Sequence, residues 1–202
     1  PVSQRFEQDI VVIVMRAALL LLCATVALAG CNQQPAEQPT LAQNEAAARE
    51  AAADLKGADR MFGFPTETIG RLNQYGYRLA PYAAAQTGFA AKGAAIMLSQ
   101  SDAKSPNTGT VTVTGPDSEA IDTIAFALSL TDDANAETAK KRLTDIVRAF
   151  LFQYGIDDKK ALDAIAKEQA FDGTIGTAPT VIAVDKGDAA RTLTVTFRRP
   201  SA

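Results

Sequence analysis

The sequence has 202 residues, of which 20 are Lys or Arg, 23 are Asp or Glu and 47% are hydrophobic. This length allows one ordinary domain with appendages. The formal net charge of −3 provides no basic surface of the kind that grips nucleic acid, so we expect no nucleic-acid partner. Histidine is absent, which excludes His-based triads and most zinc or iron sites. The sequence therefore assigns no catalytic residue, no cofactor and no metal ligand.

The segment that begins at Met15 has the layout of a secretory signal peptide. Arg16 follows Met15, and an apolar run extends from Ala17 to Ala29. The tetrapeptide Leu28-Ala29-Gly30-Cys31 resembles the lipobox of bacterial lipoproteins, in which a leucine and two small residues precede an obligatory cysteine. The resemblance covers residues 15–31 only and carries no information about the folded body.

This resemblance implies that Cys31 is the lipid-attachment residue and that the signal is removed between Gly30 and Cys31. Two or three acyl chains anchor a protein stably to a bilayer, whereas one chain binds only marginally. In enteric lipoproteins an aspartate after the cysteine causes retention in the inner membrane. Asn32 therefore favours transfer to the outer membrane, with the body facing the periplasm.

Two alternatives to the lipoprotein signal stay open. One is an uncleaved transmembrane helix from Ile10 to Ala29, which would place Arg16 in the bilayer at a cost of roughly 2.5–3.5 kcal/mol. The other is an ordinary signal peptide with a chance cysteine. We interpret residues 1–14 as upstream of the true translation start and residues 15–30 as the signal peptide. The Gln-, Asn- and Pro-rich residues 31–44 predict a flexible tether, and residues 45–202 predict a single domain.

The first half of this domain gives mixed signals. An Ala-rich stretch over 45–55 predicts a helix, and the Gly- and Pro-containing segment 60–65 predicts a turn packed on the core. Thr66 is a candidate cap for a short helix that ends before Gly76. Alanines favour helix over 77–98, but prolines and glycines interrupt it, and we expect a strand over 93–98. A polar loop is predicted over 99–108.

The second half is clearer. Alternating apolar residues predict a hairpin of strands over 110–114 and 124–130. A helix that ends at Tyr154 and a second helix that ends near Gln169 follow, and strands are predicted over 181–184 and 193–197. The order hairpin, helix, helix, hairpin predicts an α+β fold, an antiparallel sheet with helices on one face. The threonine-rich positions on the opposite face suit a surface that meets solvent or a partner.

Tyrosine and arginine gather in one short segment, and both residue types are enriched where proteins meet partners. The candidate partner-binding patch consists of Arg71, Tyr75, Tyr77, Arg78 and Tyr82. We favour the other interpretation of these residues, an aromatic rim that packs on the core while the arginines extend outward.

Other candidate chemistry is weaker. Ser101 and Lys104 have the Ser-x-x-Lys spacing of penicillin-binding proteins, but the companion Lys-Thr-Gly is missing and the segment reads as a loop. Asp132 and Asp133, like the aspartates at 157 and 158, precede predicted helices, so capping explains them better than acid–base or calcium chemistry. We therefore expect a lipid-anchored envelope protein with a structural, assembly or binding role. The alternatives are a hydrolase that acts on cell-wall material and a small-ligand carrier.

Overall fold

The computed structural model describes Thr40, Gln43, Ala46, Ala47, Glu50 and residues 54–187 and 190–201. The chain divides into two units, residues 1–46 and 47–202, and the fold described below belongs to the second. The expected signal peptide, the lipid-attachment Cys31 and most of the expected tether and Ala-rich helix lie outside the described residues.

The described body has an α+β fold, as the sequence predicts. Four α-helices and one short 3-10 helix accompany a sheet of eight strands. The helices are α3 (Gly57–Gly63), α4 (Pro65–Asn73), α5 (Ala136–Phe152) and α6 (Lys159–Ala166), and η1 (Asp133–Asn135) precedes α5. The strands are β1 (Ala83–Ala84), β2 (Phe89–Lys92), β3 (Ile96–Met97), β4 (Thr108–Gly115), β5 (Thr123–Leu130), β6 (Phe171–Ile175), β7 (Ala178–Lys186) and β8 (Arg191–Arg198).

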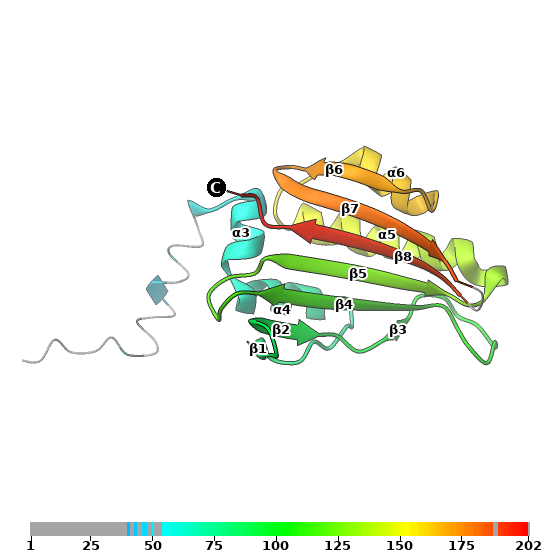
Figure 1. Cartoon of the computed structure of the whole chain (residues 1–202), viewed down its shortest axis with the longest axis horizontal. Coiled ribbons are helices and arrows are strands. Elements are labelled where there is room, and N and C mark those ends of the chain that lie inside the picture. The colour runs from blue at the N-terminus through cyan, green and yellow to red at the C-terminus, as the bar shows by residue number, and fades with distance from the viewer. Residues whose placement is uncertain are drawn as a thin grey trace, which may run out of the picture. The chain divides into compact units, whose positions relative to one another are not determined.

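The sheet is antiparallel throughout and has the strand order β1-β2-β4-β5-β8-β7-β6, with β3 paired to β4 (Figure 1). The two expected hairpins are confirmed as β4–β5 and β7–β8. They join through β5 and β8, whose register runs from Thr123 opposite Arg198 to Leu130 opposite Arg191. β8, the last strand in the sequence, thus lies inside the sheet between β5 and β7.

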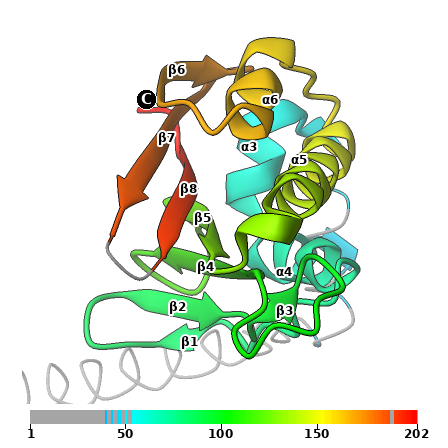
Figure 2. The same cartoon turned by 90° about the vertical axis from the view of Figure 1, so that its right-hand side faces the viewer.

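All four helices lie on one side of the sheet (Figure 2). Alternation in β5 and β8 turns their large apolar side chains toward these helices, where they are fully buried. Phe126 lies at the centre of this core and meets three other rings edge to face, those of Tyr77, Phe150 and Phe197, at centroid separations of 5.6 to 6.1 Å. Such pairs add about 0.5–1.5 kcal/mol each beyond burial.

The expected helix caps are confirmed at two aspartates. The Asp132 carboxylate accepts a hydrogen bond from the Ala134 amide at the start of η1, and Asp158 accepts one from the Ala161 amide at the start of α6. Each bond satisfies a backbone donor that the helix leaves free. Asp133 instead forms an ion pair with Arg191 at 3.0 Å.

Several predictions for the first half are wrong in detail. The segment expected to be a turn, 60–65, contains the end of α3 and the start of α4, although Met61 and Phe62 are buried in the core as expected. Only Ile96 and Met97 of the strand expected over 93–98 pair with the sheet. The sequence also gave no signal for β1, β2 or β6, whose alanines and Gly173 have weak strand propensity.

Candidate binding site

The five residues of the candidate partner-binding patch do not form one surface. Arg71 lies on α4, Tyr75 follows that helix, and Arg78 is exposed with a left-handed φ of 48°. Tyr77 is 0% exposed and belongs to the core. Tyr82 donates a hydrogen bond to the Ala120 carbonyl near the β4–β5 turn. The prediction of a single patch is therefore corrected, because Tyr77 is buried and the partly exposed Tyr75 and Tyr82 make hydrogen bonds within the chain at separate places.

Tyr77 shows why the aromatic residues of this segment are poor candidates for partner contact. Its ring packs on Phe126, and its hydroxyl has no hydrogen-bond partner among the described residues. Burial raises the pKa of Tyr77 far above its ordinary value, because ionisation would place a charge in the apolar interior. The side chain fills space under the sheet and cannot reach a partner in the folded protein.

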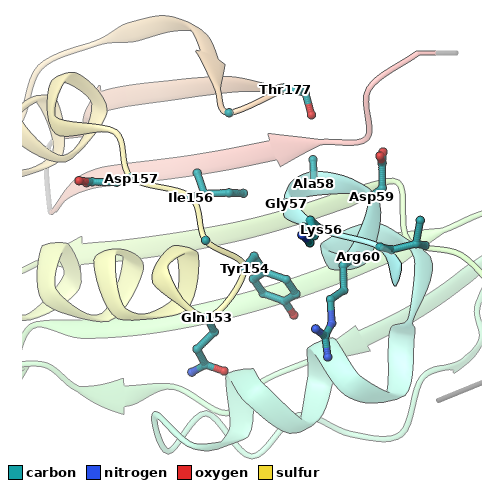
Figure 3. Close-up of a pocket in the computed structure, with 13 residues that line it drawn as sticks. Lys56, Gly57, Ala58, Asp59, Arg60, Gln153, Tyr154, Ile156, Asp157 and Thr177 are labelled. Atoms are coloured by element: carbon teal, nitrogen blue, oxygen red, sulfur yellow. The ribbon is translucent and has the colours of Figure 1, made fainter. Parts of the chain in front are cut away.

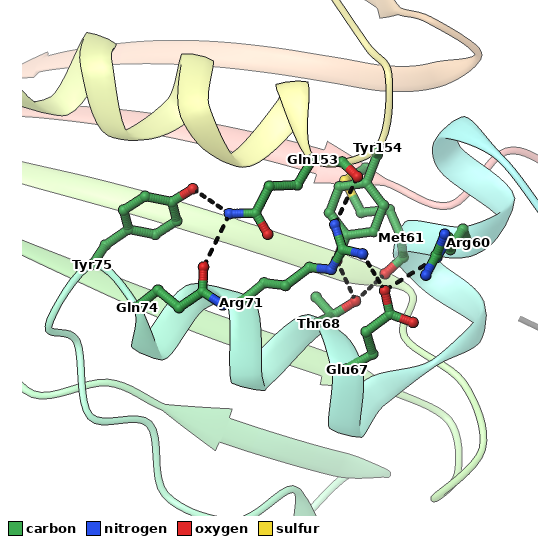
Figure 4. A network of polar contacts seen from close by, with 9 residues as sticks. All are labelled: Arg60, Met61, Glu67, Thr68, Arg71, Gln74, Tyr75, Gln153 and Tyr154. Atoms are coloured by element: carbon green, nitrogen blue, oxygen red, sulfur yellow. Dashed lines mark hydrogen bonds and ion pairs between the residues drawn. The ribbon is translucent and has the colours of Figure 1, made fainter. Parts of the chain in front are cut away.

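Arg71 and its neighbours form a polar cluster where α4 meets the end of α5 (Figure 4). Glu67 forms ion pairs with both Arg60, at 3.1 Å, and Arg71, at 2.5 Å. The Arg71 guanidinium also donates to the Gln153 carbonyl at 2.7 Å and lies 4.6 Å from the ring centroid of Tyr154. Arg71 therefore has its charge and its donors occupied by contacts within the chain.

Tyr154 belongs to the same cluster, and burial keeps its hydroxyl in the neutral form. Thr68 donates its only hydroxyl proton to the Met61 carbonyl at 2.8 Å, so in the 2.9 Å contact between the Thr68 and Tyr154 hydroxyls the tyrosine is the donor. Burial raises the pKa of Tyr154 to about 12, against smaller opposing effects from Thr68 and Arg71. This tyrosine is a structural donor and is unsuited to act as a base near neutral pH.

Gln153 extends the cluster to the predicted Tyr75. Its side-chain amide donates to the Tyr75 hydroxyl at 2.7 Å and to the Gln74 side chain at 3.3 Å. The pKa of Tyr75 is raised, chiefly by burial. Glu67 and Gln153 were not identified from the sequence. Glu67 pairs with the nearby Arg60 and Arg71, whereas Gln153 contacts residues about eighty positions away, which no local pattern predicts.

An open pocket of about 630 Å³ lies beside this cluster (Figure 3). The start of α3 and the α5–α6 connection form its walls, tied together by a hydrogen bond from the Gly57 amide to the Tyr154 carbonyl. Its charged lining residues are of both signs, namely Lys56, Arg60, Asp59 and Asp157. The Arg60 side chain is already paired with Glu67. The pocket offers a small mixed surface without an assembled nucleophile and base.

Ser101 has a structural role. Its hydroxyl donates to Asp132 at 2.5 Å, and the Asn135 side chain donates to the same carboxylate oxygen at 2.8 Å. Asn107 secures the other side of this loop by accepting from the Thr131 and Asp132 amides. The hydrogen bond from Ser101 is the main reason that the pKa of Asp132 is lowered. Lys104 is exposed and does not contact Ser101, so the Ser-x-x-Lys spacing does not assemble a catalytic pair.

The broadest candidate surface is the face of the sheet that the helices leave uncovered. β4, β5 and β8 turn short side chains outward, and these are partly exposed. They are Thr108, Thr110, Thr112, Thr114, Thr123, Ala125, Ala127, Ser129, Thr192, Thr194 and Thr196. Figure 1 shows this face unobstructed by α5 and α6. The sequence analysis predicted it from the threonine alternation, and we call it the open face.

Within the described residues, no three His, Cys, Asp or Glu side chains lie close enough to hold a metal ion. No helix in that part of the chain is long and apolar enough to span a bilayer. Comparison with known proteins found no matching family model, no matching curated protein and no matching solved structure.

Proposed function

We propose that this protein is a lipid-anchored module of the bacterial cell envelope that binds a protein partner through the open face and has no catalytic activity. Cys31, within the lipobox-like tetrapeptide, would carry the acyl chains, and residues 31–44 would hold the body away from the membrane. The body would face the periplasm, at the outer membrane rather than the inner one.

The observation that carries the binding role is the contrast between the two faces of the sheet. The helix-covered face is filled by large side chains with 0–3% exposure, such as Val113, Phe126 and Leu193. Apart from Arg198 at the end of β8, the open face consists of short side chains on long, regular strands. Small residues in a continuous sheet present a broad surface with little side-chain entropy to lose on binding, because threonine and alanine have few rotamers.

The packing disfavours the ligand-carrier alternative. A carrier of this architecture would hold its ligand between sheet and helices, where Phe126, Phe150 and Phe197 meet one another directly. The pocket beside Tyr154 is an open surface feature at the end of the helix layer. The hydrolase alternative has no assembled site among the polar groups described above.

The anchor is tested by replacing Cys31 with Ser and following palmitate labelling and membrane fractionation. We expect labelling and stable membrane retention to be lost, while Cys23→Ser, the matched control within the apolar run, leaves both unchanged if cleavage proceeds. Continued labelling of the Cys31→Ser protein would reject the anchor. Asn32→Asp, expressed in an enteric host, should move the protein toward the inner-membrane fraction.

The binding role is tested by photocrosslinking in cells. A photoreactive amino acid at Ala127, at the centre of the open face, should give defined crosslinked products. The same group at Asp163, which is exposed on α6, serves as the control for the helix side. Equal, diffuse products at both positions would contradict the proposed surface.

A further inference from the structure

One row of residues crosses the open face, continues on the same side of the sheet over β2, β7 and β6, and carries opposite charges at its two ends. The register pairs Lys92 with Thr112 and Thr112 with Ala125. It continues through Thr196 and Val181 to Asp172 on β6. Residues paired across a sheet point to the same side, so the row runs from Lys92 at the β2 side to Asp172 at the opposite edge, along a surface of short side chains.

The two charges cannot pair within one molecule. Five strand spacings separate Lys92 from Asp172, a distance of about 24 Å. Both side chains are exposed, and no ion pair involves either one in the part of the chain that the structure describes. The middle of the row falls between Ala125 and Thr196, where the two halves of the sheet join.

We infer that two copies of the chain pair through their open faces, related by a two-fold axis that runs along the strands between β5 and β8. This inference rests on the proposed function and names a second copy as the partner. The axis reverses the order of the row, so Lys92 of each copy faces Asp172 of the other and two ion pairs form. The strands of the two sheets stay aligned, as in ordinary sheet-on-sheet packing.

The charges at the two ends of the row select this axis over the other simple choice, although the same axis brings the two Arg198 side chains close together. A two-fold axis across the strands would place Lys92 near Lys92 and Asp172 near Asp172 of the second copy. Like charges brought together in this way oppose association. Only the axis along the strands makes the row complementary to itself.

The area of the open face is sufficient for a specific dimer. Six strands of four to nine residues cover roughly 600 Å² per copy and 1,200 Å² in total. This lies at the lower end of the range for specific interfaces. Threonine methyl groups and the Ala125 side chain supply apolar contact near the axis.

Arg198 provides an independent test of the proposed two-fold axis. It is exposed at the end of β8, opposite Thr123 of β5, and so lies close to the proposed axis. The axis brings the Arg198 side chains of the two copies near each other, where their charges repel. We therefore expect Arg198→Thr to strengthen self-association, because it removes this repulsion.

The test uses charge reversal in the full chain, produced in cells as two differently tagged copies and measured by co-capture and by light scattering after detergent extraction. Lys92→Asp and Asp172→Lys should each weaken self-association about tenfold or more, because each converts two attractive pairs into two repulsive ones. The double variant restores complementarity and should recover the dimer. Lys141→Asp, on the exposed side of α5, is the matched control and should have no effect.

Mixing the two single variants gives the sharpest result. A chain with Lys92→Asp and a chain with Asp172→Lys are complementary at both pairs, so each should fail to associate with itself and should associate with the other. Equal co-capture in all combinations, or a monomeric parent chain, would overturn the inference. A monomeric chain that still crosslinks another protein from position 127 would leave the proposed function standing, whereas the absence of any crosslink there would remove both.

Discussion

The Arg71 guanidinium lies over the ring of Tyr154, 4.6 Å from its centroid, and also donates to the carbonyl of the residue before it. This side chain helps to attach α4 to the carboxyl end of α5, together with the hydrogen bonds Thr68–Tyr154 and Gln74–Gln153. A residue that looked from its sequence neighbourhood like a partner contact is a connection between two helices.

Replacement of Arg71 should therefore lower stability. We expect Arg71→Ala to cost about 2 kcal/mol in the free energy of unfolding, because it removes a cation–π contact, an ion pair with Glu67 and a donor to a backbone carbonyl. Urea titration of the purified protein provides the measurement. Arg148→Ala, which removes an exposed pair on the same helix layer, should change the free energy by less than about 0.5 kcal/mol. A stability loss no larger than that of the control would contradict the structural role.

The tyrosines should make the fold sensitive to alkaline pH. The pKa values of Tyr75, Tyr77, Tyr82 and Tyr154 are all raised, chiefly by burial. The folded state therefore holds these protons more tightly than the unfolded chain, so the stability they contribute is complete below pH 10 and is lost as pH rises toward 12. Absorbance of tyrosinate should appear together with the loss of circular dichroism. Ionisation of the tyrosines near pH 10 while the protein is still fully folded would contradict their burial.

Tyr154→Phe isolates one of these groups. The variant loses the hydrogen bond to Thr68, at a cost of about 1 kcal/mol near neutral pH. It should also show a shallower fall in stability between pH 10 and 12, since one raised pKa, about 12 in the folded protein, is gone. Urea titrations at pH 7, 10 and 11 measure both effects. An unchanged slope would mean that Tyr154 does not contribute to the alkaline transition.

Replacement by alanine should change the stability of the protein in opposite directions at two glycines. At Gly88, with φ of 68°, an added Cβ would lie 2.2 Å from the Gly115 carbonyl oxygen, so Gly88→Ala should destabilise the β1–β2 hairpin by about 2 kcal/mol or more. At Gly70 in α4 an added Cβ meets nothing within 4 Å. Gly70→Ala should stabilise the protein by about 0.5–1 kcal/mol, because alanine favours helix. Thermal melts of both variants beside the parent show whether the signs differ.

Glu168 is expected to be the most sensitive carboxylate. Its side chain, 14% exposed, pairs with the buried Lys140 at 3.5 Å and with Arg191 at 3.0 Å, linking α5 to β8. We expect Glu168→Gln to cost about 1–3 kcal/mol, since it leaves buried positive charge less compensated. Glu137→Gln removes the other partner of Lys140, but that side chain is 85% exposed and should matter little. Equal effects in urea titration would contradict the difference in burial.

The sequence was most informative where a local pattern determines the structure, as in alternating apolar residues or an aspartate before a helix. Alternation predicted β4, β5 and β8, and Asp132 and Asp158 were correctly predicted as caps. The strands β2 and β6 escaped because alanine and glycine carry no strand signal, and they form only by pairing with β4 and β7. For Tyr77 the sequence left two interpretations open, and the burial of this side chain agrees with the favoured one, an aromatic rim packed on the core.

The central place of β8 has a consequence for how the protein is made. Until residues 191–198 have been synthesised, β5 and β7 each lack the neighbour that completes their hydrogen bonding. The nascent polypeptide therefore reaches its native state only after translation of nearly all of the sequence. Deleting this one segment should leave an aggregation-prone product with two unpaired edges instead of a slightly smaller sheet.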